Sequence, residues 1–163
     1  MKFKYKHHLE KFRVMRSLIA LSEFCTGCQR CVIACSYTHT KTFTPSKSRI
    51  WITRMRRKVD YITICNQCGI CINSCPFNAL KRDLKTGAVI VDEMKCTGCG
   101  FCVNACPWGA IIIDVDKRKA LKCDLCGGDP ICVKVCPENA LRFLGPTEIA
   151  KLKRINIIRL IGE

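Results

Sequence analysis

Cysteine thiols are the side chains of this chain with the clearest chemistry. All sixteen cysteines fall into four blocks, and none lies outside them. In the first three blocks, three cysteines follow one another at steps of three residues and a fourth comes four residues later; the last block has a longer gap before its third cysteine. Deprotonated thiols are metal ligands, so this pattern points to bound metal. The blocks are Cys25-x2-Cys28-x2-Cys31-x3-Cys35, Cys65-x2-Cys68-x2-Cys71-x3-Cys75, Cys96-x2-Cys99-x2-Cys102-x3-Cys106 and Cys123-x2-Cys126-x5-Cys132-x3-Cys136.

This spacing is typical of [4Fe–4S] cluster binding. Each cluster takes four thiolates, three from one short run and the fourth from another. We expect three close cysteines to wind around one cluster and the fourth, where the chain leaves this loop and starts a helix, to face a neighbouring cluster. Sixteen thiols therefore predict four clusters. Proline follows the fourth cysteine in the last three blocks and suits a turn, whereas Ser36 in the first block predicts a less constrained exit.

Other uses of cysteine fit the pattern less well. Zinc sites take two C-x-x-C pairs per metal and would leave the third cysteine of every triplet without a role. A disulfide framework is not expected, because the chain shows no secretory signal and disulfides are rare in the reducing cytosol. A thioredoxin-type C-x-x-C motif would occur once rather than in every block. The blocks therefore favour iron–sulfur ligation.

The composition indicates a thin organic core. Hydrophobic residues make up 48% of the 163 residues. Without the sixteen cysteines this share falls to roughly 38%, which is low for a globular chain. Small domains with little apolar surface commonly need metal to hold them together. We therefore expect that the metal-free chain does not fold.

The formal charge of +15 omits the cofactors. An oxidised [4Fe–4S] core and its four thiolates together carry about −2, so four clusters bring about −8 and leave about +7. This remainder favours an acidic protein partner through electrostatic steering. A nucleic-acid partner is not expected, because aromatic residues, which would be interleaved with the basic ones on a binding face, make up only 7% of the chain.

Short hairpins are expected between the blocks. Strand-forming residues follow the fourth cysteine of the last three blocks, and turn residues separate neighbouring apolar runs. Residues 54–58 form a predicted hairpin tip that is cationic and either faces solvent or docks on an acidic partner. The predicted strands lie within 49–53 and 59–64, after Leu80, at 88–91 beyond the turn 84–87, at 111–113 and 120–121 around the turn 114–119, and after Leu141.

Extensions flank the segment 23–145, which holds all four blocks. Residues 1–22 form a basic N-terminal extension. Residues 146–163 predict an amphipathic helix with Thr147 as N-cap, which covers either its own core or a partner subunit. The apolar stretches are far shorter than the roughly 20 residues that cross a bilayer, so we expect no membrane span and a cytoplasmic location.

The four blocks, with the longer gap between Cys126 and Cys132, resemble a known family. They are similar to the four-cluster, ferredoxin-like electron-transfer subunits of molybdenum and tungsten oxidoreductases, formate dehydrogenases, hydrogenases and carbon monoxide dehydrogenases. The resemblance covers about residues 23–144. Residues 34–39 and 45–50 are also similar to the small subunits that accompany tungsten aldehyde oxidoreductases and carbon monoxide dehydrogenases. The implied fold is α+β, with two fused 2[4Fe–4S] ferredoxin-like halves related by a pseudo-two-fold axis, short β-hairpins and helices, and terminal extensions.

The resemblance also implies which blocks share clusters. In the family the first block pairs with the last and the second with the third, and each pair exchanges its fourth cysteines. No cysteine is missing, so four [4Fe–4S] clusters are expected and no three-iron cluster. The implied ligand sets are a first set of Cys25, Cys28, Cys31 and Cys136, a second of Cys35, Cys123, Cys126 and Cys132, a third of Cys65, Cys68, Cys71 and Cys106, and a fourth of Cys75, Cys96, Cys99 and Cys102.

These features predict a non-catalytic electron-transfer subunit in a hetero-oligomer. It would relay single electrons between a catalytic subunit, most simply a tungsten- or molybdenum-pterin aldehyde oxidoreductase, and a second redox partner. The alternatives are a free polyferredoxin, a subunit of a carbon monoxide dehydrogenase, hydrogenase or formate dehydrogenase, and a metal-stapled nucleic-acid-binding module. No dinucleotide or phosphate-binding motif is present. We expect His7, His8 and His39 to be surface or packing residues and Trp108 to pack over a cluster.

Overall fold

The computed structural model describes residues 15–54 and 60–161. The basic residues 1–14, with His7 and His8, lie outside the described residues, as do residues 55–58 of the predicted cationic tip. The description therefore covers all four cysteine blocks.

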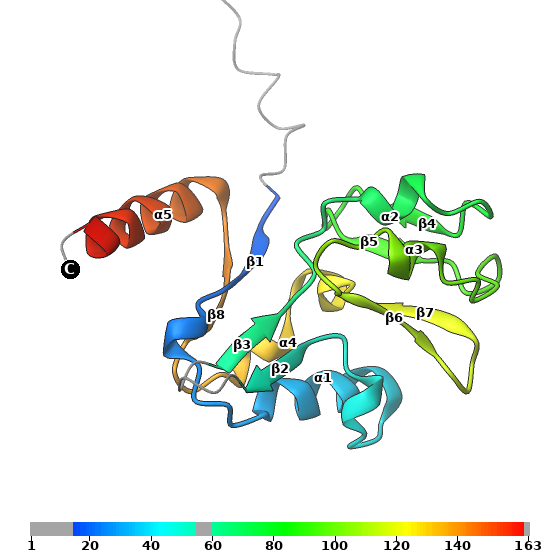
Figure 1. Cartoon of the computed structure of the whole chain (residues 1–163), viewed down its shortest axis with the longest axis horizontal. Helices are drawn as coiled ribbons and strands as arrows, with labels where there is room; N and C mark the ends of the chain where they lie inside the picture. Colours follow the sequence, from blue (N-terminus) through cyan, green and yellow to red (C-terminus); the bar gives the residue numbers. More distant parts are fainter. Residues whose placement is uncertain (1–14, 55–59, 162–163) are drawn as a thin grey trace, which may run out of the picture.

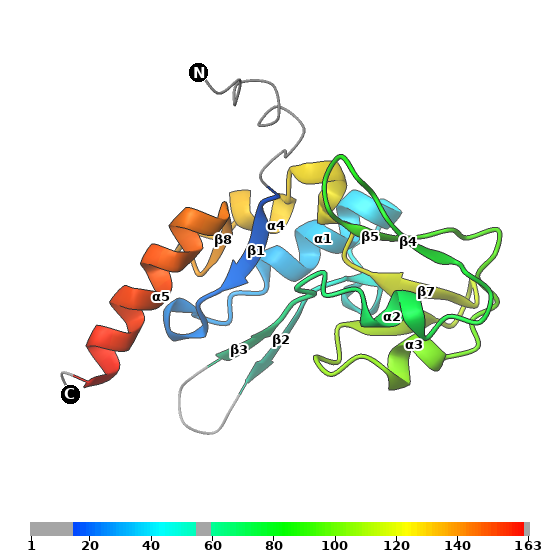
Figure 2. The same cartoon turned by 90° about the horizontal axis from the view of Figure 1, so that it is seen from above.

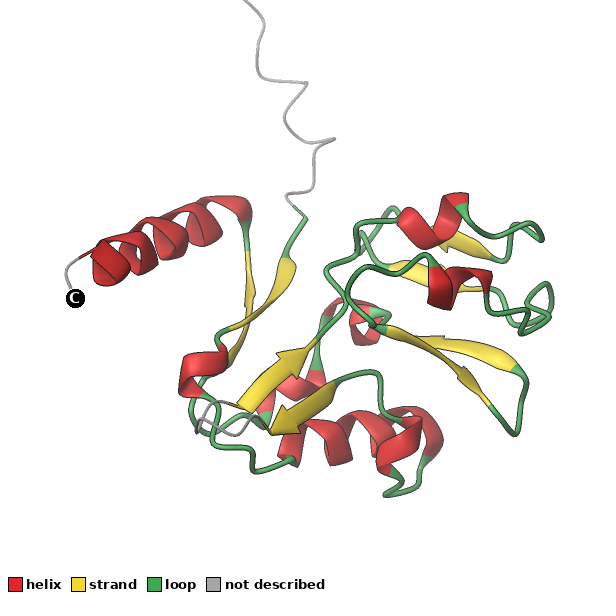
Figure 3. Ribbon diagram, in the orientation of Figure 1, coloured by secondary structure: helices red, strands yellow, loops and turns green. Residues whose placement is uncertain are grey.

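The strands form four separate antiparallel pairs (Figure 3). Three of these pairs are the predicted hairpins, which are confirmed. The fourth joins the two ends of the block region, and no sequence pattern predicted its first strand. The pairs are β1 (Ser17–Ala20) with β8 (Leu141–Leu144), β2 (Trp51–Arg54) with β3 (Asp60–Thr63), β4 (Leu80–Arg82) with β5 (Val89–Val91), and β6 (Ile111–Asp114) with β7 (Lys119–Lys122).

Each block contributes one helix, and this helix carries the third cysteine of the block. In the last three blocks the helix ends before the fourth cysteine, so the prediction that a helix starts there is wrong. The proline after that cysteine explains this, because the residue before a proline avoids the helical conformation. The helices are α1 (Arg30–Thr40), α2 (Ile70–Asn73), α3 (Phe101–Asn104) and α4 (Ile131–Lys134), and short 3₁₀ turns lie at Ser22–Phe24, Pro45–Lys47 and Leu125–Gly128.

The blocks pack in a nested order. Helix α1 packs on α4, and α2 packs on α3. We use outer half for residues 15–54, 60–63 and 123–144, which hold the first and last blocks, and inner half for residues 64–122, which hold the other two. Figures 1 and 2 show β4 to β7 with α2 and α3 on one side, and α1, α4 and the sheets β1–β8 and β2–β3 on the other.

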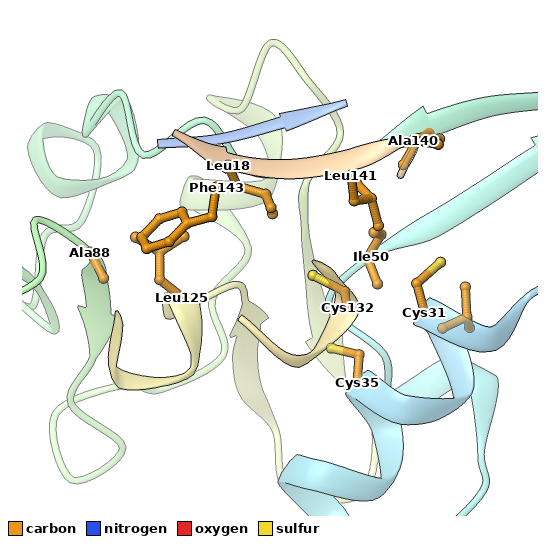
Figure 4. Close-up of a cluster of buried hydrophobic side chains, with 12 residues drawn as sticks. Leu18, Cys31, Cys35, Ile50, Ala88, Leu125, Cys132, Ala140, Leu141 and Phe143 are labelled. Atoms are coloured by element: carbon orange, nitrogen blue, oxygen red, sulfur yellow. The ribbon is translucent and has the colours of Figure 1, made fainter. Parts of the chain in front are cut away.

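Thiols make up a large part of both cores. In the outer half, Leu18, Leu141 and Phe143 of the β1–β8 sheet belong to one buried group with three cysteines of α1 and α4; Leu141 lies toward Ile50 and the cysteines, and Phe143 beside Leu125 (Figure 4). In the inner half, Leu80 and Ile111 belong to a buried group that also contains three cysteines. These cysteines are Cys31, Cys35 and Cys132 in the outer half and Cys71, Cys96 and Cys102 in the inner half.

Helix α5 (Pro146–Ile161) extends away from both halves (Figures 1 and 2). It confirms the predicted C-terminal helix, but the prediction of Thr147 as N-cap is wrong. Gly145 precedes the helix: its carbonyl accepts the first helical bond from the Ile149 N–H at 3.0 Å, and its own N–H donates to the Glu148 carboxylate at 2.8 Å. This is the carboxylate half of a capping box, with proline at the first helical position. None of the described helices is long and apolar enough to cross a membrane.

Candidate iron–sulfur centres

Left-handed backbone residues shape the loop of each block. One such residue comes directly before the second cysteine and another directly after it, and glycine, which adopts positive φ without strain, takes most of these positions. Turns of this kind direct successive backbone N–H groups to one side, which favours an anionic group there. The φ angles are 68° at Gly27 and 61° at Gln29, 61° at Gln67 and 92° at Gly69, 73° at Gly98 and 84° at Gly100, and 58° at Leu125 and 69° at Gly127.

The first predicted set of cysteines lines one hollow in the outer half. Three of its thiols come from the first block, and the fourth comes from the segment after α4. Apolar side chains of Ile52, Ile62 and Leu141 line the same hollow. Burial raises the pKa of Cys31 to about 12, and the charges of its three partners act in the same direction. The thiols that the fold brings together here are Cys25, Cys28, Cys31 and Cys136.

The third predicted set lines a hollow in the inner half. Val89, Ile111, Trp108 and Lys122 also line it. Burial raises the pKa of Cys71 to about 11. This hollow therefore combines mainly apolar walls with one cationic side chain. Its thiols are Cys65, Cys68, Cys71 and Cys106.

The second and fourth predicted sets are brought together as well. Burial raises the pKa of Cys132 in the outer half, and the charges of four nearby thiolates, three of them from its own set, raise it further. Burial likewise raises the pKa of Cys102 in the inner half, and three thiolates add to this effect. The neighbours of the same set that act in this way on Cys132 are Cys123, Cys35 and Cys126, and those that act on Cys102 are Cys96, Cys75 and Cys99.

Thiols of different sets also lie within electrostatic reach of one another. Burial is the main cause of the raised pKa of Cys132, Cys123 and Cys71, and in each case a thiolate of a neighbouring set adds to it. These neighbours connect the first set to the second, the second to the third, and the third to the fourth. The four sets therefore lie in a row. The connecting pairs are Cys31 with Cys132, Cys65 with Cys123, and Cys71 with Cys102.

Backbone N–H groups donate to the sulfur of the fourth cysteine in both inner blocks. The Ala79 N–H donates to Cys75 Sγ and the Ala110 N–H to Cys106 Sγ, each at 3.4 Å. The donor comes four residues after the cysteine, where the chain has passed its proline turn. Hydrogen bonds of this kind help to set the reduction potential of a cluster that such a sulfur ligates.

The first block leaves its loop differently. Helix α1 continues through Cys35, so the following amides bond within the helix, and the Arg49 N–H donates to Cys35 Sγ at 3.3 Å instead. Ser36 is fully buried. Its hydroxyl lies 2.8 Å from the carbonyl oxygens of Thr42 and Thr44 and accepts the Thr44 N–H at 3.0 Å. The prediction of a less constrained exit is therefore wrong, because Ser36 holds the returning loop against α1.

His39 lies beside the second set. Its Nε2 is 3.7 Å from Cys126 Sγ and 3.6 Å from Asp124 Oδ1, and only 12% of its side chain is exposed. Asp124 also accepts a hydrogen bond from Arg49 Nη1 at 2.6 Å. Burial lowers the pKa of His39, and the charge of Arg49 acts in the same direction. His39 is thus a packed residue, but the sequence reasoning missed its contact with a cysteine because nothing in the spacing relates it to the last block.

Trp108, which was predicted to pack over a cluster, is only partly buried. Its ring lines the hollow of the third set, yet 51% of the residue is exposed. Sequence reasoning also missed Lys122 and Gln67, which meet at Cys123. The available signal for Lys122 was its position at the end of a strand, directly before a cysteine block.

The donor groups in these hollows fit iron–sulfur clusters. Four thiols with inward-facing amides and apolar walls are what a [4Fe–4S] cluster takes. Because burial raises the pKa of several thiols, they are protonated in the metal-free chain and release protons when metal binds. Bound clusters of this type supply one-electron redox chemistry, while the chain sets their spacing, hydration and potential.

Matches to protein-family models agree with this chemistry. Family models of the 4Fe–4S dicluster domain match residues 64–110 and 88–137, and a model of the 4Fe–4S binding domain matches residues 22–38. A chain of the active-site complex BamBC of benzoyl-coenzyme A reductase superposes with a TM-score of 0.49 at 25% identity, over 93% of this chain and 91% of that chain.

Three relatives are electron-transfer proteins or subunits of oxidoreductases by name. The chain is 44% identical to the polyferredoxin-like subunit of the aliphatic sulfonate oxidoreductase of Pyrococcus furiosus, over 70% of this chain and 67% of that protein. It is 31% identical to formate hydrogenlyase subunit 2 of Escherichia coli (85% and 86%) and to the thiosulfate reductase electron transfer subunit PhsB of Salmonella typhi (85% and 77%). The chain therefore belongs to the family of 4Fe–4S ferredoxin-like electron-transfer subunits of oxidoreductases, which carry multiple clusters and are not catalytic alone.

Proposed function

We propose that the chain carries four [4Fe–4S] clusters, one on each of the four cysteine sets, and passes single electrons along the row between two redox partners. The observation that carries this proposal is the adjacency of the sets. Each set has thiols within electrostatic reach of the next, from the first through the second and third to the fourth. The two fused halves are then two ferredoxin-like units related by a pseudo-two-fold axis within residues 23–145, flanked by the segments 1–22 and 146–163.

The two ends of the row are the entry and exit of the relay. Cys28 in the first set and Cys99 in the fourth are exposed, as is Cys68 in the third, whereas every cysteine of the second set is buried or partly buried. Electrons pass between a cluster and a partner only over short distances, so a cluster must lie near the surface where a partner docks. The exposed terminal cysteines support docking at both ends.

We infer that one partner is a catalytic oxidoreductase subunit with a tungsten or molybdenum pterin. The relative in Pyrococcus furiosus is a subunit of an aliphatic sulfonate oxidoreductase, and residues 34–39 and 45–50 resemble the small subunits of tungsten aldehyde oxidoreductases as well as those of carbon monoxide dehydrogenases. The basic surplus that remains after the clusters are counted favours an acidic partner surface. The complex is a hetero-oligomer without nucleic acid, and it works in the cytoplasm, where reducing conditions keep thiols free.

Anaerobic co-purification tests this function. The tagged chain is purified from its own host, and the proteins that elute with it are identified and analysed for tungsten and molybdenum. We expect a pterin-containing subunit, and we expect its substrate to bleach the visible absorbance of the clusters in the complex. A chain that elutes alone, and whose clusters take electrons only from enzymes that bind it transiently, would support the free polyferredoxin instead.

A further inference from the structure

Lys122 is a buried side chain at the junction between the two halves. It ends β7 and directly precedes Cys123, where the chain passes from the inner half to the outer half (Figure 1). Only 2% of the residue is exposed. Lysine is almost never buried this far unless its charge is paired.

Three oxygen atoms surround the Lys122 Nζ atom. It donates to the Val89 carbonyl at 2.6 Å, the Cys123 carbonyl at 2.7 Å and Gln67 Oε1 at 3.0 Å. Gln67 is held in this orientation, because its Oε1 also accepts the Val89 N–H and its Nε2 donates to the Cys123 carbonyl. An ammonium group has three N–H donors, so these acceptors match a charged lysine.

No carboxylate of the described residues forms an ion pair with Lys122. The ion pairs found among those residues are formed by other basic side chains, and the neighbouring Asp124 is paired with Arg49 at 2.6 Å. A buried ammonium is unfavourable unless an opposite charge lies nearby. The counter-charge of Lys122 must therefore come from other groups.

The thiol sets on both sides of the junction can supply this charge. Lys122 lines the hollow of the third set. Burial raises the pKa of Cys71 in the third set and of Cys123 in the second, and the charge of Lys122 opposes the rise in both. A [4Fe–4S] core with four thiolates carries about −2 when oxidised and about −3 when reduced. Two anionic clusters would thus flank one ammonium.

We propose that Lys122 is a positioning residue of the relay: its fixed charge raises the reduction potentials of the second and third clusters, the pair that meets at the junction. An electron that enters either cluster adds one negative charge beside the ammonium, and no bond is made or broken. Electrons then reside more readily in the middle of the row. This inference rests on the proposed assignment of one cluster to each cysteine set.

A redox titration followed by electron paramagnetic resonance tests the inference on the full anaerobic holoprotein. In Lys122→Met, an uncharged variant of similar length, we expect two of the four potentials to fall and two to stay. A tenfold change in the equilibrium of each affected cluster corresponds to about 59 mV for a one-electron couple. Lys81→Met is the matched control, because Lys81 is exposed on β4 of the same half and no potential should move.

Lys122→Arg separates charge from shape. It should keep its iron and potentials close to those of the unmodified protein, including in the case where Lys122→Met releases iron. Unchanged potentials in Lys122→Met with full iron content would overturn the inference, as would a Lys122→Arg variant that loses iron together with Lys122→Met. A chain that binds zinc without sulfide would instead overturn the proposed function, because it has no cluster potentials to measure.

Discussion

The outer and inner halves share the same arrangement of thiols but close their loops in different ways. In the inner half, Pro76 and Pro107 follow the fourth cysteines, and the sulfur of each fourth cysteine accepts a hydrogen bond from the backbone N–H of the residue directly before the next strand. In the first block of the outer half, α1 runs for 11 residues. Ser36 within this helix anchors the returning loop, and the Arg49 N–H from that loop donates to Cys35 Sγ. After the fourth cysteine of the first block, a buried hydroxyl that anchors a returning loop thus stands where the other blocks have a turn proline.

Iron removal has the largest expected effect and should affect both halves alike. Buried thiols belong to both cores, so losing the clusters leaves each core open. Because cluster binding and folding are coupled, we expect the anaerobic apo-chain to lose its cooperative unfolding transition. Circular dichroism and hydrogen exchange measure this. Slowly exchanging amides confined to one half of an iron-free chain would show that this half folds without metal, contrary to the prediction.

The next largest effect should come from exchanging the residues that follow the fourth cysteine, serine in the first block and proline in the second. Ser36→Pro places proline inside α1, where it removes a helical hydrogen bond and the contacts of the hydroxyl, and we expect a loss of about 3 kcal/mol or more in stability. Pro76→Ser in the inner half should cost only about 0.4–1 kcal/mol, because it mainly loosens the unfolded chain. Urea midpoints of the anaerobic holoproteins measure both changes.

Ser36→Ala is the control for this exchange. It keeps α1 helical but leaves the Thr44 N–H and two carbonyl oxygens without the hydroxyl. We expect a loss of about 1–3 kcal/mol, the usual result of stranding buried polar groups. Equal losses for Ser36→Pro and Pro76→Ser would mean that the two exits are equivalent after all.

A smaller effect is expected where the halves are joined by an ion pair. Lys47, in the insertion of the outer half, donates to Asp114 at the end of β6 at 2.6 Å. Burial alone would raise the pKa of Asp114, but this bond and the amides of Lys117 and Asp116 lower it overall. Asp114→Asn should lower the thermal midpoint of unfolding by a few degrees.

The sign of the pH effect follows from the lowered pKa of Asp114. The carboxylate stabilises the fold above its unfolded pKa of about 3.9, and this contribution is lost as pH falls through the lower folded value. The difference in thermal midpoint between the unmodified protein and Asp114→Asn should therefore stay constant between about pH 8 and about pH 6, well above the unfolded pKa, where the acid-labile clusters remain bound. A difference that grows on acidification contradicts this role.

The smallest effect is expected from a surface pair in the outer half. Lys134 and Asp129 form an ion pair with side chains that are 54% and 71% exposed. Exposed pairs contribute about 0–1 kcal/mol, so Asp129→Asn should change the urea midpoint little. A loss as large as that of Asp114→Asn would show that exposure does not separate the two pairs.

Local patterns in the sequence predicted much of this molecule. The cysteine spacing, the turns 84–87 and 114–119 and the apolar runs around them specify the hairpins β4–β5 and β6–β7 over short distances. The strand β1 was not predicted, because its partner β8 lies at the other end of the block region. Gly145 was missed as N-cap because the side chain that completes the cap belongs to Glu148.

The surroundings of the cysteines were harder to predict than the cysteines themselves. His39 meets Cys126, and Arg49 meets Cys35, only because α1 continues past its block and the chain returns along it. Lys122 is a hydrophilic residue at the end of a strand, a position that usually indicates exposure. Its ammonium group donates to Gln67 of a different block, a contact that local sequence does not indicate.

Iron and acid-labile sulfide analysis of the anaerobically purified chain tests the central claim most directly. Four cysteines per [4Fe–4S] cluster and sixteen cysteines predict about sixteen iron and about sixteen sulfide per chain, with no zinc. A content of about twelve iron or fewer in fully assembled protein, or zinc without sulfide, would contradict the assignment of one cluster to each of the four sets.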